Sequence, residues 1–224
     1  PTSMKVVFDS ACNLACPSCR INFIRNEDYI TNKSRKILQD VEKYYGKSLE
    51  FISMSGYGDP FYSEALFEWL CNFSTSTYPN MANIHMHTNA MLWNENNWNK
   101  IKSAHPFIKS TEISIDASKP ETYHKVRKGG KWNLLLKNLK FINSLDQVND
   151  IILSFVIQDD NYEEIVPFYK LMNSIFDKER NLSFQYYKIL DWGILSKDEF
   201  KEKAVWNTNH PNYGKLVEQI KLLD

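Results

Sequence analysis

Short apolar stretches rich in β-branched residues alternate along this chain with longer segments whose apolar residues recur at helical spacing. The apolar stretches have the length of strands and predict six of them, over residues 4–9, 50–55, 83–88, 111–116, 151–157 and 182–190. The intervening segments predict helices over residues 34–45, from 63, from 94, and over 132–145 and 163–176. Strands and helices in strict alternation are typical of a parallel sheet with right-handed crossovers.

Six strand–helix units are too few to close an eight-stranded barrel. We therefore expect an α/β fold, an open, partial (β/α)6 barrel of the TIM type with parallel strands. The tail from Ser196 has amphipathic spacing that is interrupted at His210-Pro211, which predicts one or two further helices. The expected organisation is a core over residues 1–195 and a short helical C-terminal extension over residues 196–224.

The composition describes a globular chain with no charge bias. Of its 224 residues 43% are hydrophobic, and 27 basic residues balance 27 acidic ones. A net charge of zero gives no electrostatic footprint for nucleic acid or for an anionic membrane, so neither partner is expected. No apolar run has the length of a membrane span, and the N-terminus has no signal-peptide pattern. Free thiols fit a reducing compartment, so we expect a cytoplasmic protein.

Three of the four cysteines lie within eight residues. Cys12, Cys16 and Cys19 have C-x3-C-x2-C spacing on a stretch where Asn13 and Pro17 oppose a regular helix. Three thiolates on one short irregular loop can converge on one metal centre. A 4Fe–4S cluster held by three cysteines keeps one iron without a protein ligand, and that iron can bind and activate another molecule. The spacing favours this open cluster.

Two other interpretations of the cysteines stay open at this point. They can be buried free thiols, or they can bind zinc, which needs a fourth ligand because no second C-x2-C or H-x3-H pattern follows nearby. His124 and His210 are candidates for that ligand. The corresponding function is a non-enzymatic interaction module that binds zinc or an iron–sulfur cluster.

Other unusual residues follow the carboxyl ends of the expected strands, where parallel α/β folds build their sites. They are Gly56-Tyr57-Gly58-Asp59 after the second strand, Thr88-Asn89 after the third, Ser114 and Asp116 at the end of the fourth, and residues 158–161 after the fifth. Bare backbone at Gly56 and Gly58 lets a ligand approach closely, although a two-glycine turn is also an ordinary connection. Arg127 can hold a carboxylate in its guanidinium fork.

Polar residues of the expected fourth strand alternate with isoleucines. The two-residue period of a strand predicts that Glu112, Ser114 and Asp116 all face the mouth of the barrel, where a ribose or an amine would satisfy them. His85 and His87 share a face for the same reason, and we interpret them as side chains that line the barrel or face the substrate.

Taken together, these residues resemble the radical S-adenosylmethionine enzymes, and in detail the branch that often carries a C-terminal SPASM domain with auxiliary clusters. The similarity runs from about Met4 to Leu190. It rests on the cysteine loop and on segments that recur in the family's order, namely Ser55–Pro60, Thr88–Ala90, Ser114–Asp116 and Arg127.

The resemblance implies that Cys12, Cys16 and Cys19 ligate three irons of a 4Fe–4S cluster, and that S-adenosyl-L-methionine chelates the fourth. It implies cofactor contacts from Gly56, Tyr57, Gly58, Asp59, Asn89, Ser114, Asp116, Arg127 and Ile157. The backbone of residues 56–58 would receive the ammonium group, Ser114 and Asp116 the ribose or amino-acid part, and Arg127 the carboxylate. Ile157 would form an apolar wall on the adenine.

The implied activity is of the oxidoreductase or maturase type. The reduced cluster would cleave S-adenosylmethionine to a 5′-deoxyadenosyl radical, which abstracts hydrogen from a substrate, either a peptide or a small molecule. The electron would come from a low-potential donor of the flavodoxin or ferredoxin type. No catalytic residue beyond the cofactor contacts is predicted.

The sequence departs from the family's pattern in four places. Ser18 stands where an aromatic residue is common, Asp59 where Glu is more usual, and Ala90 where Gly is frequent. No cysteine follows Cys71, so these 224 residues offer no ligands for auxiliary clusters.

Overall fold

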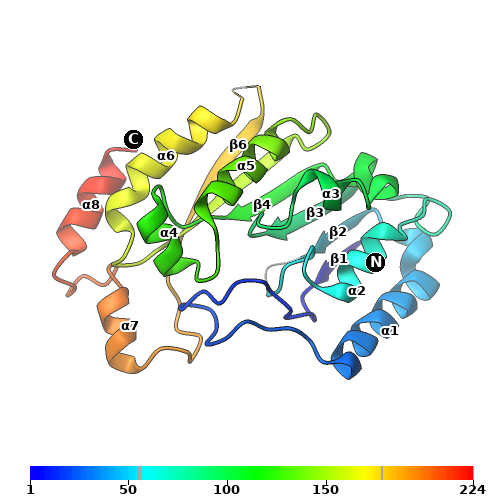
Figure 1. The fold of residues 1–224 in the computed structure, drawn as a ribbon, viewed down its shortest axis with the longest axis horizontal. Helices are drawn as coiled ribbons and strands as arrows, with labels where there is room; N and C mark the ends of the chain where they lie inside the picture. The colour runs from blue at the N-terminus through cyan, green and yellow to red at the C-terminus, as the bar shows by residue number, and fades with distance from the viewer. Residues whose placement is uncertain (55–56, 178, 224) are drawn as a thin grey trace.

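Six parallel strands form one sheet in the order β1-β2-β3-β4-β5-β6, so each strand lies beside its neighbours in the sequence (Figure 1). The computed structural model describes residues 1–54, 57–177 and 179–223. The strands are β1 (Ser3–Val6), β2 (Phe51–Met54), β3 (Asn83–Thr88), β4 (Ser110–Ser114), β5 (Asp150–Ile157) and β6 (Asn181–Lys188). Within the described residues, β6 pairs with β5 and does not close onto β1. The predicted open, partial (β/α)6 barrel is confirmed.

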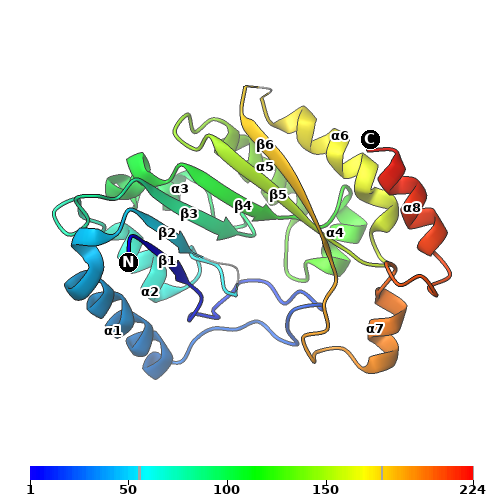
Figure 2. The same ribbon diagram turned by 180° about the vertical axis from the view of Figure 1, so that it is seen from behind.

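Helices follow each of the strands, and the last two come after β6. They are α1 (Asp28–Tyr45), α2 (Glu64–Cys71), α3 (Glu95–Trp98), α4 (Pro120–Val126), α5 (Trp132–Asn143), α6 (Ile165–Ile175), α7 (Lys197–Lys203) and α8 (Tyr213–Lys221), with short 3-10 turns at η1 (Gly46–Ser48), η2 (Lys102–Phe107) and η3 (Tyr162–Glu164). In Figure 1 several of these helices lie across the strands, whereas the view from behind in Figure 2 shows the strands without a helix in front of them.

The two faces of the sheet differ in polarity. In β3 the buried side chains of Ile84 and Met86 alternate with the half-buried side chains of His85 and His87. The strands of a parallel sheet that is covered on both faces have nearly continuous apolar sequences. The alternation in β3 therefore indicates that one face of this sheet has no helix covering it. We call this polar face the inner face of the open barrel.

Several boundaries differ from the prediction. β1 covers Ser3–Val6 rather than residues 4–9, and α1 begins at Asp28 rather than at residue 34. β4 ends at Ser114 rather than at Asp116, because Asp116 has a left-handed backbone with φ of 64° that cannot continue a strand. The sequence pattern does not predict α4, because a helix of seven residues gives too few apolar positions for a periodic signal.

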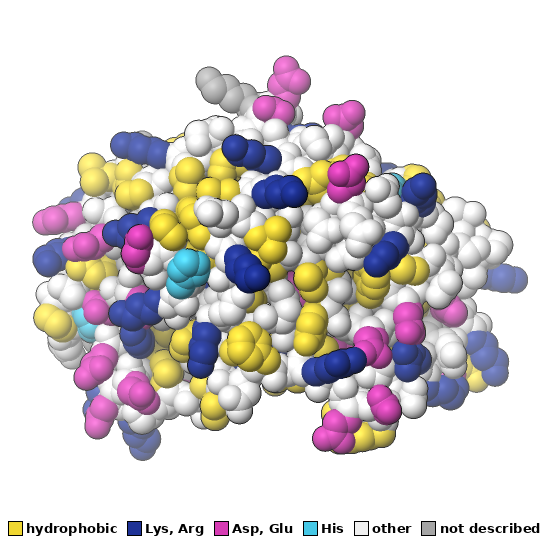
Figure 3. Space-filling view, viewed as in Figure 1, with side chains coloured by type: hydrophobic (Ala, Val, Ile, Leu, Met, Phe, Trp, Pro, Cys, Tyr) yellow, Lys and Arg dark blue, Asp and Glu magenta, His cyan; other side chains and the backbone are white. Residues whose placement is uncertain are grey.

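The last two helices pack onto the rest of the chain. Val205 and Leu216 belong to the same buried hydrophobic cluster as the strands, and the indole nitrogen of Trp206 donates to the carbonyl of Ile189 at 3.2 Å. On the face seen in Figure 3, basic and acidic side chains are interspersed, as the balanced composition suggests. Of the helices in the described ranges, none is long and apolar enough to cross a membrane.

Candidate functional site

The cysteines lie on the long connection between β1 and α1, which runs along the carboxyl end of the sheet (Figure 2). This connection is irregular, as the positions of Asn13 and Pro17 predict. It is held by backbone hydrogen bonds, from Cys12 N–H to the carbonyl of Ile24 at 2.9 Å and from Ala15 N–H to the carbonyl of Lys128 at 2.9 Å. A tight turn over 16–20 brings Cys19 N–H to the carbonyl of Cys16 at 2.8 Å.

One cavity at the carboxyl end of the sheet brings the three cysteines together with residues of β3 and β4 and of the segments that follow β2, β3 and α4. Its lining comprises Cys12, Leu14, Cys16, Cys19, Arg20, Gly58, His87, Thr88, Asn89, Ser114 and Arg127. Seven of the residues predicted for the site therefore share one cavity, although up to 115 positions separate them in the sequence (12 to 127). Parallel topology explains this, because the carboxyl ends of all strands meet at one edge.

Each cysteine sulfur receives an N–H donor from a different side chain. The three contacts are Asn89 Nδ2 to Cys12 Sγ at 3.7 Å, Arg127 Nη1 to Cys16 Sγ at 3.7 Å, and Arg20 Nη2 to Cys19 Sγ at 3.4 Å. Burial raises the pKa of the Cys12 thiol to about 11 and raises that of Cys16 as well. Such donors favour sulfur that carries negative charge, as it does when bound to a metal.

Asp59, which the resemblance implies as a cofactor contact, is buried and is absent from the lining of the cavity. Its Oδ1 accepts from Phe61 N–H at 3.0 Å, and its Oδ2 accepts from the Thr88 hydroxyl at 2.7 Å and from Asn89 N–H at 3.0 Å. Burial raises the pKa of this carboxyl, and these hydrogen bonds act in the opposite direction. Asp59 thus fixes the end of β3 against the loop after β2.

Gly58 packs directly against the start of the cysteine loop. A Cβ at this position would lie 2.6 Å from the carbonyl oxygen of Ala11 and 2.7 Å from that of Asp9. Asp59 N–H donates to the same Ala11 carbonyl at 2.8 Å. The glycine therefore permits the close approach of two loops. Its neighbour Tyr57 is 54% exposed and is absent from the lining of the cavity.

Two residues predicted as separate cofactor contacts form a buried ion pair. Arg127 Nη2 lies 2.7 Å from Asp116 Oδ2, and the side chains are 12% and 4% exposed. The second oxygen of Asp116 accepts from Val156 N–H at 2.8 Å. Arg127 lines the cavity, whereas its carboxylate partner Asp116 does not. The Nε atom of Arg127 has no hydrogen-bond partner among the described residues.

His87 and Ser114 connect the cysteine cavity to the inner face of the sheet. His87 Nε2 lies 3.1 Å from the Ser114 hydroxyl, which in turn lies 3.1 Å from that of Ser154. The other ring nitrogen of His87 lies 3.6 Å from Glu112 Oε2. Burial lowers the pKa of His87 to about 4, so its ring is neutral at pH 7. The expectation that these polar side chains share a face is confirmed for Glu112 and Ser114.

The remaining predicted residues lie elsewhere. Ile157 is buried at the end of β5 and does not line the described part of the cavity. Gly56 lies outside the described residues. One residue of the cavity was not predicted from the sequence. Arg20 lines the cavity beside Cys19. Its position directly after the third cysteine is the signal that could have found it.

The cysteines fit an iron–sulfur cluster better than a single ion. Among the residues that the structure describes, no three His, Cys, Asp or Glu side chains are close enough to hold one metal ion. Zinc requires all its ligands at about 2.0–2.3 Å from one point, whereas a cubane cluster spreads three thiolates over three irons. The zinc interpretation is not favoured.

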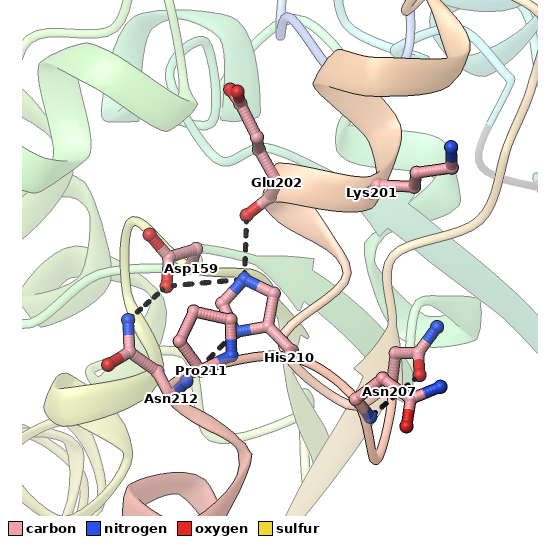
Figure 4. A pocket seen from close by; sticks show the side chains of 8 residues that line it. Asp159, Lys201, Glu202, Asn207, His210, Pro211 and Asn212 are labelled. Atoms are coloured by element: carbon pink, nitrogen blue, oxygen red, sulfur yellow. Dashed lines mark hydrogen bonds and ion pairs between the residues drawn. The ribbon is translucent and has the colours of Figure 1, made fainter.

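A larger surface pocket of about 630 Å³ lies between the loop after β5 and the α7–α8 region. Figure 4 shows His210 in this pocket, pointing toward Asp159. His210 Nε2 lies 3.0 Å from the carbonyl of Glu202, and its Nδ1 accepts from Asn212 N–H at 3.2 Å. Both ring nitrogens are engaged here, and His210 does not line the cysteine cavity, so it cannot serve there as a zinc ligand.

The fold is similar to that of several solved structures. Streptococcus suis SuiB bound to precursor peptide SuiA has a TM-score of 0.61 and 15% identity, over 99% of this chain and 45% of SuiB. AnSMEcpe with bound AdoMet has a TM-score of 0.57 and 18% identity, over 85% of this chain and 52% of that chain. HydG, a maturase of the [FeFe]-hydrogenase, has a TM-score of 0.56 and 14% identity, over 89% of this chain and 47% of HydG. This chain thus spans about half the length of each.

No curated protein matches the sequence. The family model described as the Radical SAM superfamily matches residues 6–172, which is most of the chain and includes the cysteine loop and strands β2 to β5. The chain therefore belongs to the radical S-adenosylmethionine superfamily, whose enzymes use a 4Fe–4S cluster and S-adenosylmethionine.

Proposed function

We propose that Cys12, Cys16 and Cys19 hold the 4Fe–4S cluster in the cavity described above, and that the chain is the catalytic core of an enzyme of this superfamily. One observation carries the proposal. Three thiols from one irregular loop face a single cavity, and each sulfur has its own N–H donor. Metal-bound thiolates need such donors, whereas inert buried thiols do not.

We assign the wall of the cavity formed at the ends of β3, β4 and α4 to S-adenosylmethionine. Asn89, Ser114 and Arg127 line this wall, and the unpartnered Nε of Arg127 is a donor that remains for a carboxylate. Gly58 lines the same cavity, and the backbone of residues 56–58 would receive the ammonium group. Asp116 would act through Arg127, and Asp59 through the end of β3.

We place the adenine at the end of β5, against Ile157. The side chain of the next residue supports this placement, because Gln158 is 4% exposed and its Nε2 has no hydrogen-bond partner among the described residues. A buried amide without a partner costs free energy, so a ligand atom that accepts from it would be favoured.

When bound, the cluster and S-adenosylmethionine supply one-electron reductive cleavage followed by hydrogen-atom abstraction from a substrate. The chain's own residues position and shield these groups. Leu14 and the buried Thr88 at the end of β3 help to exclude water from Cys12 and Cys16, which are both buried. The electron must come from outside, from a low-potential donor of the flavodoxin or ferredoxin type.

We propose that the substrate lies on the inner face of the sheet, where His87 marks the passage from the cysteine cavity. The face is polar and has no helix across it (Figure 2). SuiB is bound to a precursor peptide, and an anSMEcpe structure with a TM-score of 0.52 contains the Cp18Cys peptide. A peptide is accordingly the substrate class that we favour over a small molecule. Residues 1–195 would form this catalytic core and residues 196–224 an extension of it.

Anaerobic reconstitution with iron and sulfide tests the proposal. The protein should bind about four iron and four sulfide per chain, become brown, and release 5′-deoxyadenosine and methionine when S-adenosylmethionine and dithionite are added. Serine at any of the three cysteines should abolish the colour, whereas serine at Cys71 in α2 should preserve it. A folded protein that stays colourless, or one that binds stoichiometric zinc instead, would contradict the proposal.

A further inference from the structure

Arg20 is a buried cation with no anionic partner in the described part of the chain. Its residue is 8% exposed, and its guanidinium donates to the carbonyl of Ser10 at 2.9 Å and to the carbonyl of Tyr57. It also contacts the sulfur of Cys19 at 3.4 Å, and its guanidinium carbon lies 5.9 Å from the centroid of the Tyr57 ring. None of the ion pairs found among the described residues includes Arg20.

A buried charge is costly unless an opposite charge lies close to it. The other arginine of the cavity meets this requirement, because Arg127 lies 2.7 Å from the carboxylate of Asp116. The third donor to sulfur, Asn89, is neutral. Of the three side chains that donate to the cysteines, Arg20 alone brings a positive charge that no carboxylate of the described residues balances.

Three thiolates and an oxidised 4Fe–4S cluster, which carries two positive charges, have a net charge of minus one, and reduction adds a second negative charge. We propose that Arg20 is the counter-charge of the loaded cysteine site and that it makes reduction of the cluster easier. This inference rests on the proposed function. Hydrogen bonds to cluster sulfurs and the net charge around them set the reduction potential, and the low dielectric of a buried site strengthens both effects.

The alternative is that Arg20 only holds the loop, since its contacts with Ser10 and Tyr57 join the cysteine loop to the loop after β2. That role uses hydrogen bonds, which a neutral amide can partly replace. It does not depend on the positive charge. A measurement of the reduction potential separates the two roles, because the potential responds to charge.

The experiment compares reconstituted wild type with Arg20→Gln, Arg20→Lys and Arg35→Gln, without added S-adenosylmethionine or substrate. Arg35 pairs with Glu68 at the surface, between α1 and α2, and serves as a matched arginine-to-glutamine control. Iron and sulfide content measures assembly, and a redox titration followed by electron paramagnetic resonance measures the midpoint potential.

We expect Arg20→Gln to lower the equilibrium constant for cluster reduction by about tenfold, which is about 59 mV for a one-electron couple. Arg20→Lys should stay near wild type because it keeps the charge, and Arg35→Gln should not differ. An unchanged potential in Arg20→Gln would overturn the inference. If that variant does not fold, Arg20→Lys decides, because a tenfold loss despite the retained charge would also overturn it. Failure of the wild type to assemble a cluster contradicts the proposed function instead.

Discussion

The guanidinium of Arg127 lies 2.7 Å from the carboxylate of Asp116, and this buried pair joins the loop after β4 to the end of α4. The pair sets the position of Arg127 Nη1, which lies 3.7 Å from Cys16 Sγ. It also depends on an unusual backbone, because Asp116 adopts a φ of 64° and so turns its side chain out of the strand direction. Local backbone geometry, an ion pair and the metal site are thus linked through two residues.

Asp116→Asn should destabilise the protein strongly. Asparagine tolerates the left-handed region, so the backbone is preserved, and its Oδ1 can still accept from Val156 N–H. The lost carboxylate leaves Arg127 as an unpaired buried cation, which should lower the free energy of unfolding by about 3–5 kcal/mol. Denaturant unfolding of the protein without a cluster measures this.

Asp40→Asn provides the control for this prediction, because it removes the partner of Lys36 in an exposed pair on α1. Such a surface pair contributes about 0–1 kcal/mol. An equal decrease in the free energy of unfolding in the two variants would show that the buried Asp116–Arg127 pair stabilises the protein no more than an exposed pair does.

Gly58→Ala should separate the two loops that meet at the site. The added methyl group would lie 2.6 Å from the carbonyl of Ala11, and a backbone atom can relieve this contact only by moving the loop. Overpacking of this kind costs about 1–3 kcal/mol. Because Ala11 directly precedes Cys12, we also expect less iron per chain after reconstitution.

Gly214→Ala is the matched control. Gly214 lies in α8 with no heavy atom within 4 Å of its hypothetical Cβ, so alanine should be neutral or stabilise the helix by up to about 1 kcal/mol. Iron binding should be unaffected in this control. A normal iron content in Gly58→Ala would mean that the cysteine loop does not depend on this packing.

The order of strands and the grouping of the cysteines could be predicted from the sequence because each depends on a short-range pattern. The strands have continuous apolar runs, and the three cysteines have a fixed spacing on one loop. Parallel topology then places the residues after each strand at one edge of the sheet, which is why Asn89 and Ser114 reach the same cavity as Cys12. No long-range contact had to be known in advance.

The direction of individual side chains could not be predicted in this way. A strict two-residue period places Asp116 beside Ser114, but the left-handed backbone of Asp116 breaks that period. Ala90 also has a positive φ, of 60°, and glycine is the residue that adopts this conformation without strain, which explains why alanine is unusual there. The position of Arg20 after the third cysteine could have placed it at the site, but the absence of an ion-pair partner among the described residues is a property of the folded chain.

Asp59→Asn should weaken the connection between the loop after β2 and the end of β3. Both carboxylate oxygens accept hydrogen bonds, Oδ1 from Phe61 N–H and Oδ2 from Thr88 and Asn89. An amide replaces one oxygen with a donor that would face another donor, which should cost about 1–3 kcal/mol. Chemical denaturation checks the loss of stability. An unchanged free energy of unfolding would show that the protein relaxes around this buried group.

Asp160→Asn should change how stability depends on pH. Asp160 lies in the loop after β5, where Lys125 of α4 reaches its Oδ1 at 2.5 Å and Lys203 of α7 contacts its Oδ2. Burial alone would raise the pKa of Asp160, but the two lysines outweigh burial and lower it. The folded state therefore binds this proton less tightly than the unfolded state, whose pKa is about 3.9. The stabilisation is present above that value and is lost as the pH falls through the lower pKa of the folded state.

Unfolding curves recorded from pH 7 to pH 3 test this relationship. Wild type should exceed Asp160→Asn by a constant margin above about pH 5, and the margin should shrink as the pH approaches 3. Asp198→Asn is the control, because its partner Lys201 is exposed on the same helix, α7. Because Lys203 joins α7 to the core, Asp160→Asn should also speed proteolysis within residues 196–212 at pH 7. A margin that persists unchanged at pH 3 would mean that the amide, and not the lost charge, destabilises the variant.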